Sequence, residues 1–296
     1  MDQGQYIPYP SYNYNDTDQH RLAVEAKIKP NSFMNPNQLE AVVKPLRALD
    51  FHQTQTGRWP EEDEWEYGAH HEAEWCRICH IGYFQSPINI DPDITFKSAE
   101  FLHRPHFPIR LHYHPTSLKG NFNAKTFIVQ GNLGNLAVNS FIHQDQSRIF
   151  DEAQFHFHAP SEHLLNGRRY DLEMHVVHKE RSNTNNIAVL GFVFKEDGVR
   201  NPFIDQVIRS SLEPTYIDMN LLIPQKSGVF YYEGSLTTPP AFETVLWFVV
   251  GHVLSVNREQ LEFFARQWGM NPAFAGGKGN YRELQPPNGR AVIYFE

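Results

Sequence analysis

The feature that most constrains the fold is a repeated alternation between short strand-like runs and turn residues. From Trp59 to the C-terminus, runs rich in Val, Ile, Phe and Tyr are broken by Gly, Pro and Asn at intervals of about 8–12 residues. The clearest runs are Arg110 to His114, Thr126 to Val129, Leu136 to Phe141, Glu152 to His158, Leu172 to Lys179, Ile187 to Lys195, Val229 to Tyr232, Thr244 to Leu254 and Ala291 to Phe295. Only Pro202 to Leu212 and Asn257 to Trp268 are good helix candidates. We therefore predict one mainly β domain (α+β) with a few peripheral helices.

The first 58 residues differ from the rest of the chain. Tyr, Asn, Pro, Gln and Asp dominate the first twenty, and one modest helical pattern follows from Asn37 to Leu49, with Pro45 inside it. We predict an N-terminal extension over residues 1–58, partly irregular with one short helix, which either wraps the main domain or is partly mobile. Residues 59–296 then form a single domain, although a length of 296 residues alone would favour about two domains.

Charge and hydropathy exclude several classes of protein. Lys and Arg number 26 and Asp and Glu 34, so the net charge of −8 argues against a nucleic-acid partner. The most apolar stretch, Val245 to Val256, is too short to cross a bilayer, so no transmembrane segment is expected. The N-terminus lacks the basic and apolar regions of a signal peptide. Either an intracellular protein or a processed secreted form fits these observations.

Histidine is frequent and cysteine rare, at 16 against 2 residues, so a metal site in this chain would be built from imidazoles. In the run Gln154 to His158, Phe and His alternate, and a strand would direct both His side chains to one face. Same-face neighbours lie about 6.6–7 Å apart along a strand, which lets two imidazoles converge on one ion. The run Glu173 to His178 follows a polar, hairpin-like connection, and His175 is well placed to add a third ligand.

Three neutral imidazoles leave the fourth position of a tetrahedral zinc open to water, which is the arrangement of a catalytic site. The ion would lower the pKa of that water from about 15.7 to about 7. Gln154 and Glu173 each lie two residues from a histidine on the same face, and are candidate acceptors for the ring N–H groups. Chance is the alternative, because an isolated His-x-His pattern, such as His112 to His114, arises easily in a histidine-rich chain.

Several motifs resemble those of the α-class carbonic anhydrases and follow the same order. They are WxYG at Trp65 to Gly68, QSPINI at Gln85 to Ile90, QFHFHAPSEH at Gln154 to His163, ExHxVH at Glu173 to His178, IAVLGF at Ile187 to Phe192, GSLTTPP at Gly234 to Pro240, ETVLW at Glu243 to Trp247, and NxRxxQPxxxR at Asn280 to Arg290. The resemblance covers residues 59–296. It implies a large, mostly antiparallel, twisted central sheet with zinc at the base of a cone-shaped cleft, and reversible hydration of CO2 to bicarbonate and a proton.

The resemblance assigns metal ligands and their hydrogen-bond partners. The implied pairs are His156 with Gln154, His158 with the backbone carbonyl of Asn280, and His175 with Glu173. Thr237 matches a threonine whose hydroxyl accepts from zinc-bound hydroxide and donates to a buried carboxylate, here Glu162. Because an ionised Glu162 can only accept, Thr237 would select and orient the hydroxide form. The alternatives are a surface carboxylate for Glu162 and a turn residue for Thr237.

The resemblance also implies residues that contact substrate and line the cleft. The apolar wall that receives CO2 would comprise Val177, Val189, Leu236 and Trp247, with Thr238 at the position that contacts bicarbonate. Tyr67 and Asn123 match positions that order water or line the cleft. Each of these apolar residues, taken alone, fits a plain core better than a substrate wall. Anionic and sulfonamide inhibitors are expected to bind.

Two features depart from the family pattern. Lys125 stands where the fastest members carry a histidine that shuttles protons, and an unperturbed lysine with a pKa near about 10.4 holds its proton too tightly for that task. We therefore expect catalysis limited by proton export, unless His70 and His71 substitute. The second departure concerns the cysteines. This chain cannot form the disulfide that many secreted relatives form, and it has Cys76 and Cys79 in the run WCRIC instead. Two free thiols and a local disulfide both remain open.

Two other functions remain open. The first is a catalytically weak relative that serves as a binding or matrix protein through its N-terminal extension. Relatives without catalysis typically lack a ligand, whereas all three histidines, Thr237 and Glu162 are present here. The second is a histidine-rich metal buffer using the residues His103, His106, His112 and His114.

Overall fold

The computed structural model describes residues 65–68, 72, 75–98, 108–139, 148–224, 227–268, 274 and 277–296. The predictions for residues 1–58, including the helix at Asn37 to Leu49, lie outside the described residues. The same holds for the boundary at Trp59 and for the candidates His70, His71, His103 and His106.

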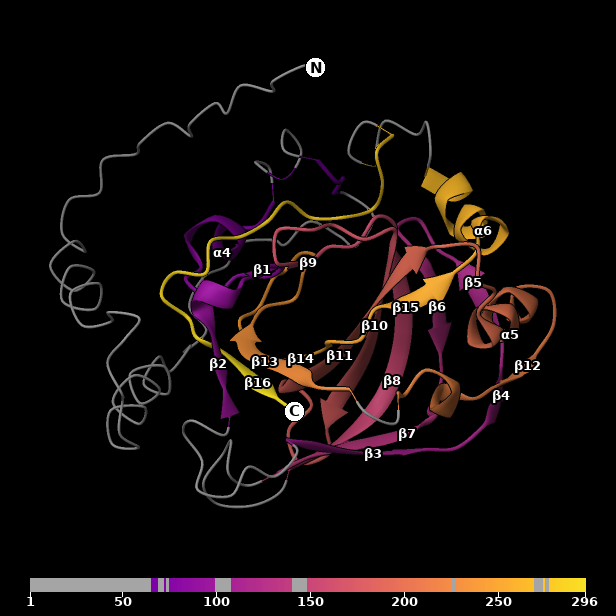
Figure 1. Ribbon diagram of the computed structural model, residues 1–296, viewed down its shortest axis with the longest axis horizontal. Helices are drawn as coiled ribbons and strands as arrows, with labels where there is room; N and C mark the ends of the chain where they lie inside the picture. Colours follow the sequence, from indigo (N-terminus) through magenta and orange to yellow (C-terminus); the bar gives the residue numbers. More distant parts are fainter. Residues whose placement is uncertain are drawn as a thin grey trace, which may run out of the picture. The chain divides into compact units, whose positions relative to one another are not determined.

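Twelve strands form one large mixed sheet (Figure 1). Its main path runs in the order β2 (Thr95–Lys97), β16 (Val292–Phe295), β13 (Val229–Gly234), β14 (Val245–Val250), β11 (Ile187–Glu196), β10 (Leu172–Glu180), β8 (Arg148–His158), β6 (Phe127–Gln130) and β5 (Gly120–Phe122). Off this path, β15 (Leu254–Val256) pairs with β11, β7 (Gly134–Val138) with β8, and β3 (Ile109–Tyr113) with β7. Only β11–β14, β11–β15 and β16–β2 are parallel among these described pairs, so the predicted mostly antiparallel sheet is confirmed.

The remaining elements are short. Two small sheets pair β1 (Asn89–Ile90) with β9 (Leu164–Leu165) and β4 (Thr116–Leu118) with β12 (Thr215–Ile217). Among the described residues, the helices are α4 (Arg77–Ile81), α5 (Pro202–Ser210) and α6 (Arg258–Trp268), with 3-10 turns η2 (Pro92–Ile94) and η4 (Met219–Leu221). Within the described ranges, no helix is long and apolar enough to cross a membrane.

Both predicted helices are present. The residues at the start of α5 explain why the sequence predicts where this helix begins. Pro202 occupies the first helical turn, and the side chain of Asn201 accepts hydrogen bonds from the backbone N–H groups of Phe203 and Ile204. In contrast, the single strand expected from Thr244 to Leu254 is two strands, because the chain bends at Gly251, whose N–H donates to the carbonyl of Gly228 at 2.8 Å. The helix α4 was not predicted.

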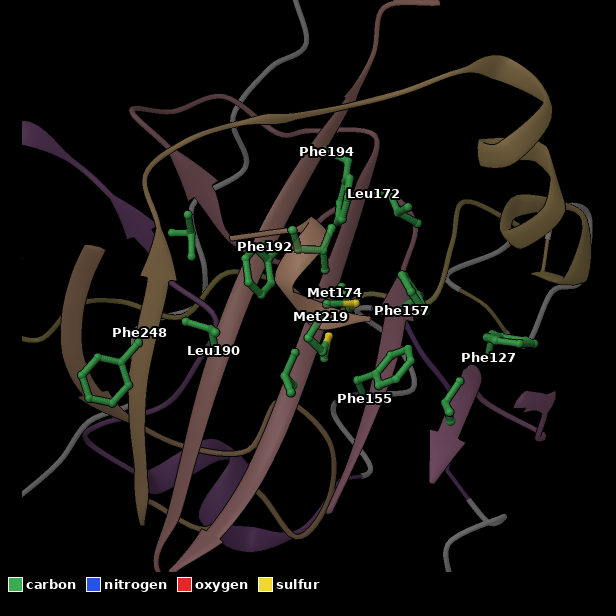
Figure 2. Close-up of a cluster of buried hydrophobic side chains, with 14 of the residues drawn as sticks. Phe127, Phe155, Phe157, Leu172, Met174, Leu190, Phe192, Phe194, Met219 and Phe248 are labelled. Atoms are coloured by element: carbon green, nitrogen blue, oxygen red, sulfur yellow. The ribbon is translucent and has the colours of Figure 1, made fainter. Parts of the chain in front are cut away.

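The alternation along β8 separates the two faces of the sheet. Phe155 and Phe157 point into the main apolar core, where they join side chains such as Met174 and Phe192 (Figure 2). His156 and His158, which alternate with these phenylalanines, therefore point to the opposite face of the sheet. On that face lies a second, smaller apolar cluster that includes Trp247.

The strands β8 and β10 are also joined at the end remote from the histidines. Arg148 at the start of β8 donates two hydrogen bonds to the carboxylate of Glu180 at the end of β10, at 2.8 and 2.5 Å. These hydrogen bonds lower the pKa of Glu180 to about 2. Because a bidentate pair has a defined geometry, it helps to set the register of the two strands that carry the histidines.

Candidate metal and active site

Three histidines converge on one point from two adjacent strands. In the antiparallel pairing of β8 and β10, His175 lies directly opposite His156, and Glu173 lies opposite His158. The ring centroids of the three histidines are 4.6–5.3 Å apart. One nitrogen from each ring lies within 4.8 Å of the other two. The structure thus brings together the three predicted ligands.

The second nitrogen of each ring faces an oxygen acceptor. His156 Nδ1 lies 2.8 Å from Gln154 Oε1, His158 Nδ1 lies 2.7 Å from the carbonyl of Asn280, and His175 Nε2 lies 2.8 Å from Glu173 Oε1. A carbonyl or carboxylate oxygen requires a proton on the nitrogen that faces it, so the opposite nitrogen of each ring carries a lone pair.

These lone pairs fit a metal ion. His158 Nε2 is buried and has no hydrogen-bond partner among the described residues, which is costly for a polar atom unless something else binds it. Burial lowers the pKa of His158 to about 4 and also lowers the pKa of His156 and His175, so all three rings are neutral. Neutral imidazoles with aligned lone pairs are good ligands for a divalent transition metal.

Asn280, whose carbonyl faces His158, is held in place by the hydrogen bonds of its own side chain. The Asn280 side chain accepts from the backbone N–H of Ala159 at 2.9 Å and donates to the carbonyl of Phe157 at 2.8 Å. The preceding residue, Gly279, has a φ of 141°, and an added Cβ would lie 2.1 Å from the Ala159 carbonyl oxygen. The Asn280 carbonyl is therefore positioned by a segment distant in sequence from β8.

Glu173 is the centre of a buried hydrogen-bond network. Its Oε1 accepts from His175 and from His163 Nδ1 at 2.7 Å, and its Oε2 accepts from the backbone N–H groups of Glu162 and His163, both at 2.8 Å. Burial alone would raise the pKa of Glu173, but His163 and His175 hold this pKa well below its usual range. All four donors point at one carboxylate, which keeps it ionised.

The network extends to His163, a residue that the sequence motifs did not single out as part of the site. His163 Nε2 accepts from the Tyr232 hydroxyl at 2.6 Å, and Tyr232 in turn lies 3.0 Å from the Ser86 hydroxyl. His163 is fully buried and belongs to a second cluster of metal-capable side chains with Glu173 and His175. Its position at the end of the QFHFHAPSEH string was the available signal.

Glu162 and Thr237 lie beside the histidine cluster. Glu162 is fully buried, its Oε1 accepts from the backbone N–H of Arg282 at 2.8 Å, and the same oxygen lies 3.5 Å from His158 Nδ1. Burial raises the pKa of Glu162, while His175 and the Thr237 hydroxyl oppose that rise. Glu162 Oε2 has no hydrogen-bond partner within the described ranges. Glu162 is thus a buried carboxyl, unlike the surface residue that was the alternative.

The four predicted wall residues lie together. Val177, Val189 and Trp247 belong to the smaller apolar cluster, and the half-buried Leu236 packs against it. Val189 is the register partner of both Val177 and Trp247, and the Trp247 ring lies 4.8 Å from the His175 ring between centroids. An apolar surface therefore borders the histidine cluster. Thr238 is half-buried, and its carbonyl accepts from the Ala241 N–H at 2.8 Å.

Three further predicted positions have defined environments. Tyr67 is buried, with its ring edge-on to Trp65 at 4.9 Å. The Asn123 side chain accepts from the backbone N–H groups of Lys125 and Thr126 at 2.8 and 2.7 Å, which stabilises the turn that carries Lys125. Lys125 Nζ donates to the Trp65 carbonyl and lies 4.7 Å from the Trp65 ring centroid.

The other histidines and the cysteines complete the comparison with the predictions. His112 and His114 are exposed and belong to neither of the two metal-capable clusters found among the described residues. Cys76 and Cys79 form a disulfide with a Cα–Cα distance of 5.3 Å. Of the two alternatives for this pair, the structure therefore has the local disulfide.

A mainly β protein with three neutral imidazoles on neighbouring strands, each backed by an oxygen acceptor, has the arrangement of side chains that could hold a metal ion through three histidines. Comparison with known proteins identifies the family. The model of the eukaryotic-type carbonic anhydrases matches residues 62–296, and the chain belongs to this family.

Individual relatives support the same assignment. Alpha carbonic anhydrase 3 of Arabidopsis thaliana is 33% identical over 238 residues, covering 76% of this chain and 78% of the relative. An alpha-carbonic anhydrase from Thermovibrio ammonificans, solved with the inhibitor sulfanilamide, has 33% identity and a TM-score of 0.62, covering 79% of this chain and 100% of the relative. Dioscorin DB3S of Dioscorea polystachya is also similar, with 29% identity over 76% of this chain and 81% of the relative.

Proposed function

We propose that this protein is a zinc-dependent carbonic anhydrase that hydrates CO2 reversibly to bicarbonate and a proton. The observation that carries the proposal is the cluster of His156, His158 and His175, whose ring nitrogens converge within 4.8 Å. The buried and unpartnered Nε2 of His158 supports it, because this atom needs a ligand. A zinc ion bound there would act as a Lewis acid and lower the pKa of water to about 7.

The residues around the ligands hold the protons in fixed places. Gln154, Glu173 and the Asn280 carbonyl keep one proton on the outer nitrogen of each ring, which leaves the inner nitrogen free for the metal. The Thr237 hydroxyl opposes the rise in the pKa of Glu162, so the two side chains lie close together, and an ionised Glu162 could only accept from Thr237. The Thr237 oxygen would then keep a lone pair that could accept a hydrogen bond from the attacking hydroxide and orient it.

The apolar wall suits an uncharged, linear substrate. Val177, Val189, Leu236 and Trp247 offer CO2 a surface without hydrogen-bonding groups next to the ligands. We propose that the Thr237 N–H and Thr238 bind the product bicarbonate, and that anions and sulfonamides occupy the same place. The similarity to a carbonic anhydrase solved with sulfanilamide supports this expectation.

We propose that proton export limits the rate, because Lys125 is a poor shuttle. The Trp65 carbonyl accepts a hydrogen bond from Lys125 Nζ, and the Trp65 ring lies beneath the charge. Both contacts restrain the movement of the amine, whereas a shuttle must release its proton near neutral pH and reorient.

The variant Lys125→His is expected to hydrate CO2 about tenfold faster than the natural protein in weak buffer, because an imidazole titrates near ambient pH. The difference should shrink in concentrated buffer, which carries protons away by itself. Stopped-flow CO2 hydration over a series of buffer concentrations measures both effects. Lys119→His, at an exposed position outside the turn, is the matched control. Equal rates for Lys125→His and the natural protein in weak buffer would rule out the shuttle explanation.

The proposed function is tested by CO2 hydration with and without a zinc chelator and a sulfonamide. We expect activity that the chelator removes, that added zinc restores and that the sulfonamide inhibits, with one zinc per chain by elemental analysis. Activity that persists in zinc-free protein would refute the proposal. A zinc-loaded but inactive protein would instead favour the alternative of a binding or matrix protein.

A further inference from the structure

The Cys76–Cys79 disulfide lies outside the residues used above. The chain has 2 cysteines, and both are in this bridge, which spans the first turn of α4. Both residues are mostly buried, with 6% and 5% of their surface exposed, while His80 and Ile81 directly after them are exposed. The bridge therefore lies just under the surface at one end of α4.

The first sulfur touches the loop that carries Thr237. Cys76 Sγ lies 3.2 Å from the carbonyl oxygen of Pro240, although the two residues are 164 positions apart. A disulfide sulfur carries no proton, so in the oxidised protein this is a packing contact and not a hydrogen bond. Pro240 is three residues from Thr237 in the same loop, which closes on itself where the Leu236 N–H donates to the Phe242 carbonyl at 3.1 Å.

The second cysteine is connected to Glu162. The carbonyl of Cys79 accepts from Arg282 Nη2 at 3.0 Å, and the backbone N–H of the same arginine donates to Glu162 Oε1 at 2.8 Å. The Arg282 side chain is buried and its Nη1 also donates to the Ser86 carbonyl at 2.7 Å, so it has little freedom to adjust. Cys76 thus contacts the loop that carries Thr237, and Cys79 is linked through Arg282 to Glu162.

We propose that Cys76–Cys79 is a redox site that controls the Thr237–Glu162 pair, with a dithiol as its reductant. The inference rests on the proposed function for its effect on activity. When the bond is reduced, the two sulfur atoms can no longer remain at covalent distance. Cys76 must then move against Pro240, or Cys79 must shift the carbonyl that binds Arg282. Reduced Cys76 also gains a proton that it can donate to the Pro240 carbonyl. Each change displaces one member of the pair.

The exchange needs no other reactant. A thiolate of the dithiol attacks one cysteine sulfur, which forms a mixed disulfide and releases the other cysteine as a thiolate. The second thiolate of the reductant then attacks the mixed disulfide, closes its own disulfide and releases the remaining cysteine. Two electrons pass from the reductant to the protein. The two protons of the dithiol end on Cys76 and Cys79.

The experiment compares the zinc-loaded protein before and after treatment with dithiothreitol under native conditions. We expect mass spectrometry after alkylation to find both cysteines modified, and kcat/KM for CO2 hydration to fall about tenfold, since a misplacement of 1 Å can cost up to about 100-fold. Hydrogen exchange of the backbone amides in residues 236–242 should become faster on reduction. Reoxidation should restore both properties.

The double variant Cys76→Ser/Cys79→Ser is the matched control. It should resemble the reduced protein and should not respond to dithiothreitol, which separates the redox effect from any binding of zinc by the reagent. The proposal is overturned if the bond resists reduction until the protein unfolds. It is also overturned if both cysteines are alkylated while hydrogen exchange in residues 236–242 stays the same. An oxidised protein without CO2 hydration would contradict the proposed function instead, and hydrogen exchange would still report on the redox site.

Discussion

Replacement of His158 by alanine is expected to abolish metal binding and to reduce CO2 hydration to the background rate. His158 is buried, its Nδ1 is bound to the Asn280 carbonyl, and its Nε2 has no other partner in the part of the chain that is described. Without this ligand two imidazoles remain, which is too few for the tetrahedral site with one open position. Because water loses its lowered pKa of about 7 when the ion is lost, hydroxide becomes scarce at neutral pH and the rate should fall by orders of magnitude.

Zinc content by elemental analysis and stopped-flow CO2 hydration measure this effect side by side. The matched control is His112→Ala, which removes an exposed histidine on β3 and should leave one zinc and full activity. Circular dichroism shows whether both variants keep the sheet. A folded His158→Ala protein that retains one zinc and full activity would mean that the metal lies elsewhere.

Replacement of Glu173 by glutamine is expected to have the second largest effect, although the two side chains have nearly the same shape. Each carboxylate oxygen of Glu173 accepts from two donors, and the amide offers only one oxygen. In one orientation the amide N–H groups face the backbone N–H groups of Glu162 and His163. In the other they face His175, which must then move its proton to Nδ1, the nitrogen that would bind the metal.

Either orientation leaves buried donors without acceptors, so we expect the free energy of unfolding to fall by about 3 kcal/mol. We also expect zinc affinity to fall about 10–100-fold. Chemical denaturation of the apo protein and competition with a chelator measure the two quantities. Gln154→Leu is the matched control, because it removes one acceptor from the half-buried His156 and should cost much less stability. Equal losses in the two variants would contradict the central role given to Glu173.

The fold class and the shared face of His156 and His158 could be predicted from local pattern, whereas the full ligand set came from the family resemblance. Period-two alternation of Phe and His in β8 predicts which side chains share a face, because the strand geometry leaves no other choice. The capping residue Asn201 and Pro202 mark the start of α5 in the same local way. In contrast, the break between β14 and β15 involves a hydrogen bond from the Gly251 N–H to the carbonyl of Gly228, a partner outside residues 244–254, and Gly251 was the only local signal of it.

The surroundings of the cluster depend on contacts between segments far apart in sequence. In the sequence His163 is only the last residue of a motif. In the folded chain its ring lies between Glu173 and Tyr232 and contacts both. Lys125 was recognised as an unsuitable shuttle from its chemistry, but its contact with Trp65 became evident only in the folded chain. The Cys76–Cys79 bridge was one of two alternatives, and its approach to Pro240 could not be foreseen from spacing.

The sequence by itself determined that this chain forms a β-rich domain and carries two imidazoles at strand spacing, with a third histidine in a later strand-like run, because strand periodicity and side-chain chemistry are local properties. Only the tertiary structure decided which proton each imidazole holds and what surrounds it. Tautomer and burial depend on acceptors such as the Asn280 carbonyl and the Glu173 carboxylate, which folding brings within 3 Å of the rings. The physical reason is that a hydrogen bond acts only at contact distance, and the contact between His158 and the Asn280 carbonyl joins residues that are more than 100 positions apart in the chain.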